Sequence, residues 1–189
     1  DLSRWRDLVV CSILVLLPMG LIIMQKETGS ALVYLAFFLM FYREGMVGSI
    51  LFAGTAAVFY FVVGVRFAEV PLWEIAQIST GEFFVLAGIH IFSACMMWVY
   101  TSLRKPFFQV LIFGMGAYVL AVLYAKYLIP INACWVQWIV LAITIGYLVY
   151  LSISKQLWSY ALIALFAIGS IGFFYSVNYV LNDVLQPHQ

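Results

Sequence analysis

One short run of polar residues holds most of the side chains that could do chemistry in this chain. It is Gln25-Lys26-Glu27-Thr28-Gly29-Ser30, and it joins two apolar runs with almost no loop. The second run is too short to cross a membrane alone, so we expect the turn to lie below the outer surface, inside the protein. Pro18 and Gly29 loosen the backbone there. A carboxylate at that depth is costly unless it is paired or hydrated, and intramembrane acids usually mark a cavity or pathway.

A second interpretation of this run remains open. An ordinary outer hairpin loop with a solvated Lys26–Glu27 pair fits the same residues equally well. If the turn is buried, Glu27 has two sources of charge compensation: Lys26 beside it, or a base on a helix outside this chain. The turn alone is therefore not a catalytic signature.

Composition decides the solvent in which the chain folds. Of its 189 residues, 66% are hydrophobic and 9% are charged, whereas a soluble domain carries about 25% charged residues. A water-soluble fold of this size could not bury so much apolar surface, so lipid is the solvent. The net charge is +1 and there is no basic cluster, which gives no indication of nucleic-acid binding. The three cysteines show no metal-ligand spacing, and we expect them to be small buried hydrophobes.

Charges divide the sequence into apolar stretches of membrane-spanning length. A spanning helix needs about 20 apolar residues, and backbone polar groups in lipid must be satisfied within the segment. We therefore predict an all-α fold, a polytopic integral membrane helical bundle of about seven transmembrane helices. The predicted spans are Leu8–Gln25, Thr28–Tyr42, Gly45–Val65, Phe83–Leu103, Pro106–Ala125, Tyr127–Ser154 and Gln156–Asn182. The loop Arg66–Glu82 is expected to lie along the outer surface as a short amphipathic segment.

The distribution of Lys and Arg predicts the orientation. If the first helix runs outward, six basic residues lie on the cytoplasmic side, namely Arg4, Arg6, Arg43, Arg104, Lys105 and Lys155. Three lie outside, namely Lys26, Arg66 and Lys126. The residues Asp183–Gln189 would then face outward.

Three segments resemble the SEDS proteins (shape, elongation, division and sporulation). The first is Leu17-Pro18 followed by the run Gln25–Val33, where these proteins typically show Pro in the helix and then Gln-Pro-Asp-Leu-Gly-Thr-Ala-Leu. Glu27 falls on the family's acidic position and Gly29 on its glycine, while Lys26 replaces the usual proline. The second is Gly45-Met46 after the next helix, where the family has a similar glycine-containing turn. The third is the end of the chain, Leu185-Gln186-Pro187-His188-Gln189, which is similar to Leu-Lys-Pro-Tyr-Gln at the start of the family's large outer loop.

The resemblance favours the RodA branch as found in Bacteroidota over the FtsW branch, and it is strong over residues 8–50 and 175–189. It divides a single transmembrane domain into three parts. Residues 1–65 are SEDS-like helices with the polar turn at 25–30, residues 66–155 are inserted helices, and residues 156–189 form a SEDS-like helix that leads into the outer loop. Four extra spans are an even number, so the outer loop that begins at Leu185–Gln189 stays on the same side of the membrane as in the family. We expect the chain to be an internal piece of a longer protein.

The resemblance implies a function in the bacterial inner membrane. SEDS proteins polymerise lipid II into peptidoglycan with a class B penicillin-binding protein, and the RodA branch acts in elongation with other elongation-complex membrane proteins. The essential acid is expected in the outer loop beyond Gln189, so no residue here is assigned as catalytic. Gln25, Lys26, Glu27 and Gly29 are the substrate-cavity candidates. No metal site or cofactor is evident, although a divalent cation is compatible with the chemistry.

Two other classes of function remain as alternatives. A transporter or lipid flippase also fits many helices with a polar break, and a scaffold would use small residues for close helix contacts. The inserted helices carry His90, Ser93, Asn132 and Gln137. An intramembrane histidine is a candidate functional residue, but we expect His90 to be packed and hydrogen-bonded.

Overall fold

The computed structural model describes residues 5–24, 33, 37, 40, 41, 43, 48–73, 75–101, 104–128 and 132–179. The chain divides into two compact units, Asp1–Val58 and Phe59–Gln189, with the division inside helix α4. In the first unit, α1 (Trp5–Met24) contains Pro18. Its Val15 is buried against four partly buried side chains, Cys11, Phe41, Ile50 and Leu51.

Five described helices are long and apolar enough to cross a membrane. They are α4 (Gly48–Arg66), α5 (Thr80–Tyr100), α6 (Arg104–Tyr127), α7 (Ala133–Lys155) and α8, which runs over Trp158–Tyr179 and is apolar through Val177. They correspond to the predicted spans from Gly45–Val65 onward. The count of about seven is not confirmed: α1 is not among these five helices, and the stretch Thr28–Tyr42 falls largely outside the described residues. The helical, multi-pass character of the chain is confirmed.

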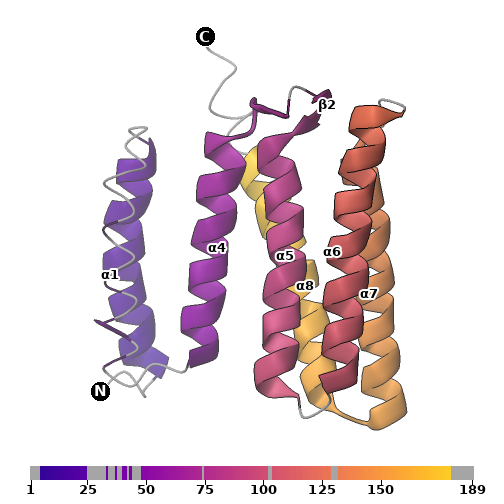
Figure 1. The fold of residues 1–189 in the computed structure, drawn as a ribbon. Helices are drawn as coiled ribbons and strands as arrows, with labels where there is room; N and C mark the ends of the chain where they lie inside the picture. The colour runs from indigo at the N-terminus through magenta and orange to yellow at the C-terminus, as the bar shows by residue number, and fades with distance from the viewer. Residues whose placement is uncertain are drawn as a thin grey trace. The chain divides into compact units, whose positions relative to one another are not determined.

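The second unit is a bundle in which α5 packs against α6, α7 and α8 (Figure 1). A core cluster draws residues from all four of these helices: Met97, Val110, Leu148, Leu151, Tyr160, Ile163 and Ala164. Large apolar side chains such as Phe113, Ile153 and Trp158 are exposed, as expected where the surrounding solvent is lipid. Cys134 is buried, but Cys95 is exposed on α5, so the expectation that all three thiols are buried is wrong for Cys95.

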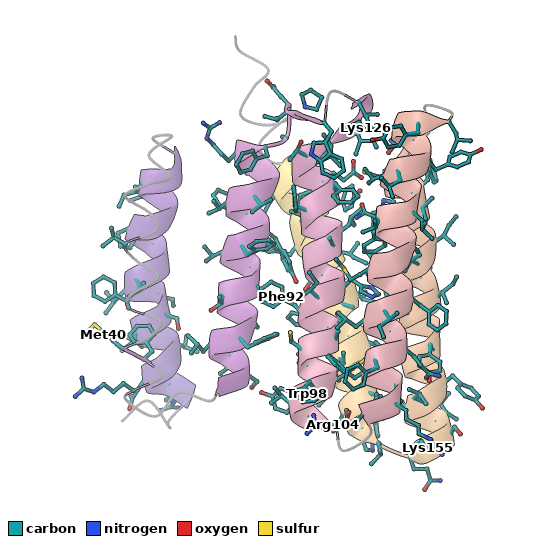
Figure 2. The ribbon with its side chains drawn as sticks, viewed as in Figure 1. Met40, Phe92, Trp98, Arg104, Lys126 and Lys155 are labelled. Carbon is teal, nitrogen blue, oxygen red and sulfur yellow. The ribbon has the colours of Figure 1, made fainter. Side chains whose placement is uncertain are left out.

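Local signals set the helix ends. Ser79 caps α5, and its hydroxyl accepts the Glu82 N–H at 3.3 Å. The side chain of Asn132 accepts the Cys134 N–H at 3.0 Å, so α7 begins at Ala133 and not at Tyr127 as predicted. At the opposite end of the bundle, the Arg104 guanidinium lies 3.7 Å from the Trp98 ring centroid and donates to the Trp98 carbonyl at 3.1 Å, which holds the α5–α6 turn (Figure 2).

The loop between α4 and α5 is a β-hairpin. Strand β1 (Pro71–Leu72) pairs antiparallel with β2 (Ile75–Ser79), in the loop for which the sequence predicted a short amphipathic segment. Two backbone hydrogen bonds close the loop between the end of α4 and the start of α5. The Thr80 N–H donates to the Val70 carbonyl at 2.8 Å, and the Gly81 N–H donates to the Phe67 carbonyl at 2.9 Å. In a loop this short, the backbone N–H and C=O groups find their hydrogen-bond partners within the loop itself.

Candidate functional site

The sequence-predicted site lies outside the described residues. Gln25, Lys26, Glu27 and Gly29 all fall within the segment 25–32, for which the structure gives no placement. Their role as a substrate cavity stays a prediction. The structure instead describes two polar clusters and two pockets in the second unit.

The first cluster joins α5, α7 and α8 near the hairpin end. The Tyr175 hydroxyl on α8 donates to the Glu82 carboxylate on α5 at 3.2 Å. The Tyr175 ring lies against Trp138 of α7, with centroids 5.6 Å apart. Cys134, on the same helix, is close enough to Glu82 for an electrostatic interaction. We call these four residues the Glu82 cluster.

Local sequence explains why Glu82 is placed there. Ser79-Thr80-Gly81-Glu82 has the spacing of a capping box, in which the acid would bond back to the capping residue. Here the Ser79 hydroxyl donates to the Ala68 carbonyl at 2.7 Å, and the Glu82 carboxylate receives the hydrogen bond from Tyr175. A carboxylate in the first turn also interacts favourably with the helix dipole. The hydrogen bond from Tyr175 to Glu82 therefore ties α5 to α8.

Gln137 provides a second link between α5 and α7. It is fully buried, and its Nε2 donates to the Phe83 carbonyl at 3.1 Å. Its Oε1 has no hydrogen-bond partner within the described part of the chain. The side-chain amide of Gln137 therefore has a hydrogen-bond partner for its nitrogen but none for its oxygen among the described residues.

The second cluster, which we call the His90 cluster, joins α5 to α6. His90 is completely buried, and its Nε2 lies 2.9 Å from the Val110 carbonyl oxygen. A carbonyl only accepts, so Nε2 carries the proton and Nδ1 of the neutral ring is an acceptor. The Tyr118 ring meets the imidazole edge-on, with centroids 5.4 Å apart. The expectation of a packed, hydrogen-bonded histidine is confirmed.

Gly114 makes this contact between the helices possible. A Cβ at position 114 would lie 2.0 Å from His90 Nε2 and 2.3 Å from Cε1. Only a residue without a side chain lets the imidazole lie across α6 and reach Val110. Gly116, two residues further along α6, has nothing within 4 Å of the same position.

Two pockets open on the bundle surface. One, of about 480 Å³, lies between α6 and α7, where the Tyr147 hydroxyl donates to Gln109 Oε1 at 3.0 Å. The other, of about 520 Å³, lies between the hairpin, α5 and α6. We call the latter the hairpin pocket. Across the described ranges, no three His, Cys, Asp or Glu side chains come close enough together to hold a metal ion.

Sequence reasoning missed the main partners in both clusters. Glu82 carried a signal in its capping-box spacing, whereas Tyr118 and Tyr175 carried none, because their partners lie on other helices.

A scan against protein-family models found no match, and searches of curated proteins and solved structures found none either. Fold and composition together define a helical multi-pass membrane protein.

Proposed function

We propose that this chain is part of a RodA-like peptidoglycan glycosyltransferase that polymerises lipid II for cell-wall elongation and cell shape. The observation that carries the proposal is the run Gln25–Val33, with an acid and a glycine at SEDS-like positions, together with the ending Leu185–Gln189. The apolar helices support a membrane location of the kind such an enzyme needs.

The chemistry follows from the two lipid-linked substrates. A hydroxyl of the acceptor sugar attacks the anomeric carbon of the donor, a new C–O bond forms, and the bond to the lipid pyrophosphate breaks. By the resemblance, an acid of the family's large outer loop would take the hydroxyl proton as general base. Lys26 would offset charge on the departing pyrophosphate, as would a divalent cation. Glu27, Gln25 and Gly29 would shape the cavity that holds both substrates.

The inserted helices are assigned a different role in this proposal. In the second unit α5, α6, α7 and α8 form a bundle of their own, tied by the Glu82 cluster and the His90 cluster. Such a bundle suits the docking of a membrane partner, and the proposed partners are a class B penicillin-binding protein and other elongation-complex membrane proteins.

A transporter or lipid flippase is the second candidate. The observation in its favour is an ionisable side chain inside an apolar span, His90 on α5, with Glu82 in the first turn of the same helix, because such residues often line transport pathways. Both make hydrogen bonds that also suit a structural role, which places this candidate second.

One pair of assays separates the two candidates. The complete gene product that contains this chain is reconstituted with its class B partner and given fluorescent lipid II. Polymerisation is read as glycan strands on a gel, and translocation is read as quenching of labelled lipid by an impermeant reagent. The glycosyltransferase proposal expects strands that are lost with Glu27→Ala, with Glu69→Ala on the exposed loop as the matched control. Translocation without strands would favour the flippase.

A further inference from the structure

The hairpin pocket has an apolar wall contributed by three elements. Trp73 comes from the hairpin, Phe83 and Phe84 come from α5, and Val119 and Leu123 come from α6. Its volume of about 520 Å³ lies within the range of roughly 300–1,000 Å³ that is usual for small-ligand sites. The wall is suited to a hydrocarbon chain.

A lysine lies at the edge of this apolar wall. Lys126 is three residues beyond Leu123 on α6, which places the two on the same face of the helix. Its Nζ lies 5.5 Å from the Trp73 ring centroid and 5.7 Å from that of Tyr127. An ammonium group carries three N–H donors, which suit phosphate oxygens.

The depth of Lys126 matches the lipid headgroups. Helix α6 has 24 residues, so it is about 36 Å long at the usual rise, slightly more than a hydrocarbon core of about 30 Å. Lys126 is in its last turn. Figure 2 shows it at the hairpin end of the bundle, opposite Arg104 and Lys155. A lysine there has its stem in the apolar layer and its charge among phosphates.

Trp73 has an unusual backbone that fits a binding role. Its φ is +46°, a left-handed conformation, and its side chain is 63% exposed. A bulky residue in that region is uncommon and costs about 1–3 kcal/mol. In this conformation the indole of Trp73 both lines the pocket and lies near Lys126.

We propose that the hairpin pocket binds an anionic glycerophospholipid of the surrounding bilayer, with one acyl chain between the hairpin and α6 and the phosphate on Lys126. An acyl chain gains little by leaving a bilayer for an apolar pocket, because both surroundings are hydrocarbon. The charge at the rim therefore supplies the preference, and a lipid with net negative charge is favoured over a zwitterionic one. This inference does not depend on the proposed enzymatic function.

Photocrosslinking of lipids tests the site directly. The complete gene product in mild detergent is equilibrated with phosphatidylglycerol or phosphatidylcholine, each with a photoreactive group at the end of one acyl chain. Crosslinks are mapped by peptide mass spectrometry. The proposal expects phosphatidylglycerol to label the segments 72–84 and 119–126 in preference to phosphatidylcholine. Lys126→Gln should weaken that labelling about fivefold, the effect of one basic residue near an anionic headgroup.

Matched variants keep the outcome clear. Lys105→Gln removes an exposed lysine in the first turn of the same helix and should leave labelling of 119–126 unchanged. Leu123→Trp fills the pocket and should abolish labelling by either lipid, whereas Leu120→Trp, outside the pocket, should not. Equal labelling by the two lipids would overturn the proposal. So would a Lys126→Gln result that matches that of Lys105→Gln, or retention of labelling in Leu123→Trp.

Discussion

Replacing Gly114 with alanine should disrupt the packing of α5 on α6. The new Cβ would lie 2.0 Å from His90 Nε2, whereas ordinary contacts begin near 3.4 Å. The imidazole must therefore move by about 1.4 Å or α6 must move away. The bond from Nε2 to the Val110 carbonyl is 2.9 Å long, and a displacement of that size breaks it.

The magnitude follows from two effects. Forcing an extra methyl group into a packed interior costs about 1–3 kcal/mol, and an interhelical hydrogen bond in a membrane protein contributes about 0.6 kcal/mol on average. We therefore expect Gly114→Ala to lower the free energy of unfolding by about 2–4 kcal/mol. The cost of the clash is larger than the contribution of the lost hydrogen bond.

The assay is equilibrium unfolding in mixed micelles, titrated with sodium dodecyl sulfate and followed by tryptophan fluorescence. Gly116→Ala is the matched control, since nothing lies within 4 Å of its Cβ position; alanine is the better helix former, so stability should stay the same or rise by up to about 1 kcal/mol. His90→Ala makes room for the methyl group, so the double variant should be more stable than the sum of the single effects predicts. If Gly114→Ala unfolds like Gly116→Ala, the described α5–α6 contact is wrong.

Three further predictions concern other parts of the second unit. Tyr175→Phe removes the hydroxyl that donates to Glu82 and should lower stability by about 0.5–1.5 kcal/mol in the same titration; an unchanged midpoint would mean that this link contributes nothing. Gln137→Leu removes a donor but also a buried, unpartnered oxygen, so the net change should stay within about 1 kcal/mol, and a loss of several kcal/mol would show that Oε1 is satisfied in the folded protein. For orientation, a cysteine at Lys126 should react with an impermeant maleimide in intact cells and a cysteine at Lys155 should not; the reverse pattern would invert the predicted topology.

The helical spans could be predicted from the sequence because charges bracket apolar runs. Arg104 and Lys126 enclose α6, and Lys155 closes α7. Hydropathy alone did not place the start of α7, since the run from Tyr127 is apolar but the side chain of Asn132 caps the helix five residues later. The hairpin was missed because β1 has only two residues, too few for an alternating pattern to be recognised.

Contacts between helices could not be predicted from one sequence. His90 and Gly114 meet across two helices, and Glu82 and Tyr175 are 93 residues apart. Nothing in the neighbourhood of either residue indicates its partner, because helix packing depends on which faces meet and not on local pattern. The polar turn shows the opposite case: its residues are recognisable in the sequence, while its geometry lies outside the described residues.

Polymerisation of lipid II is the most direct test of the central claim. The complete gene product, purified with a class B penicillin-binding protein, is given labelled lipid II, and the products are separated by length. The proposal predicts glycan strands from the wild type and their loss with Glu27→Ala, while Glu69→Ala retains them. No strands from the wild type under conditions where a known polymerase makes them would contradict the assignment to RodA-like enzymes.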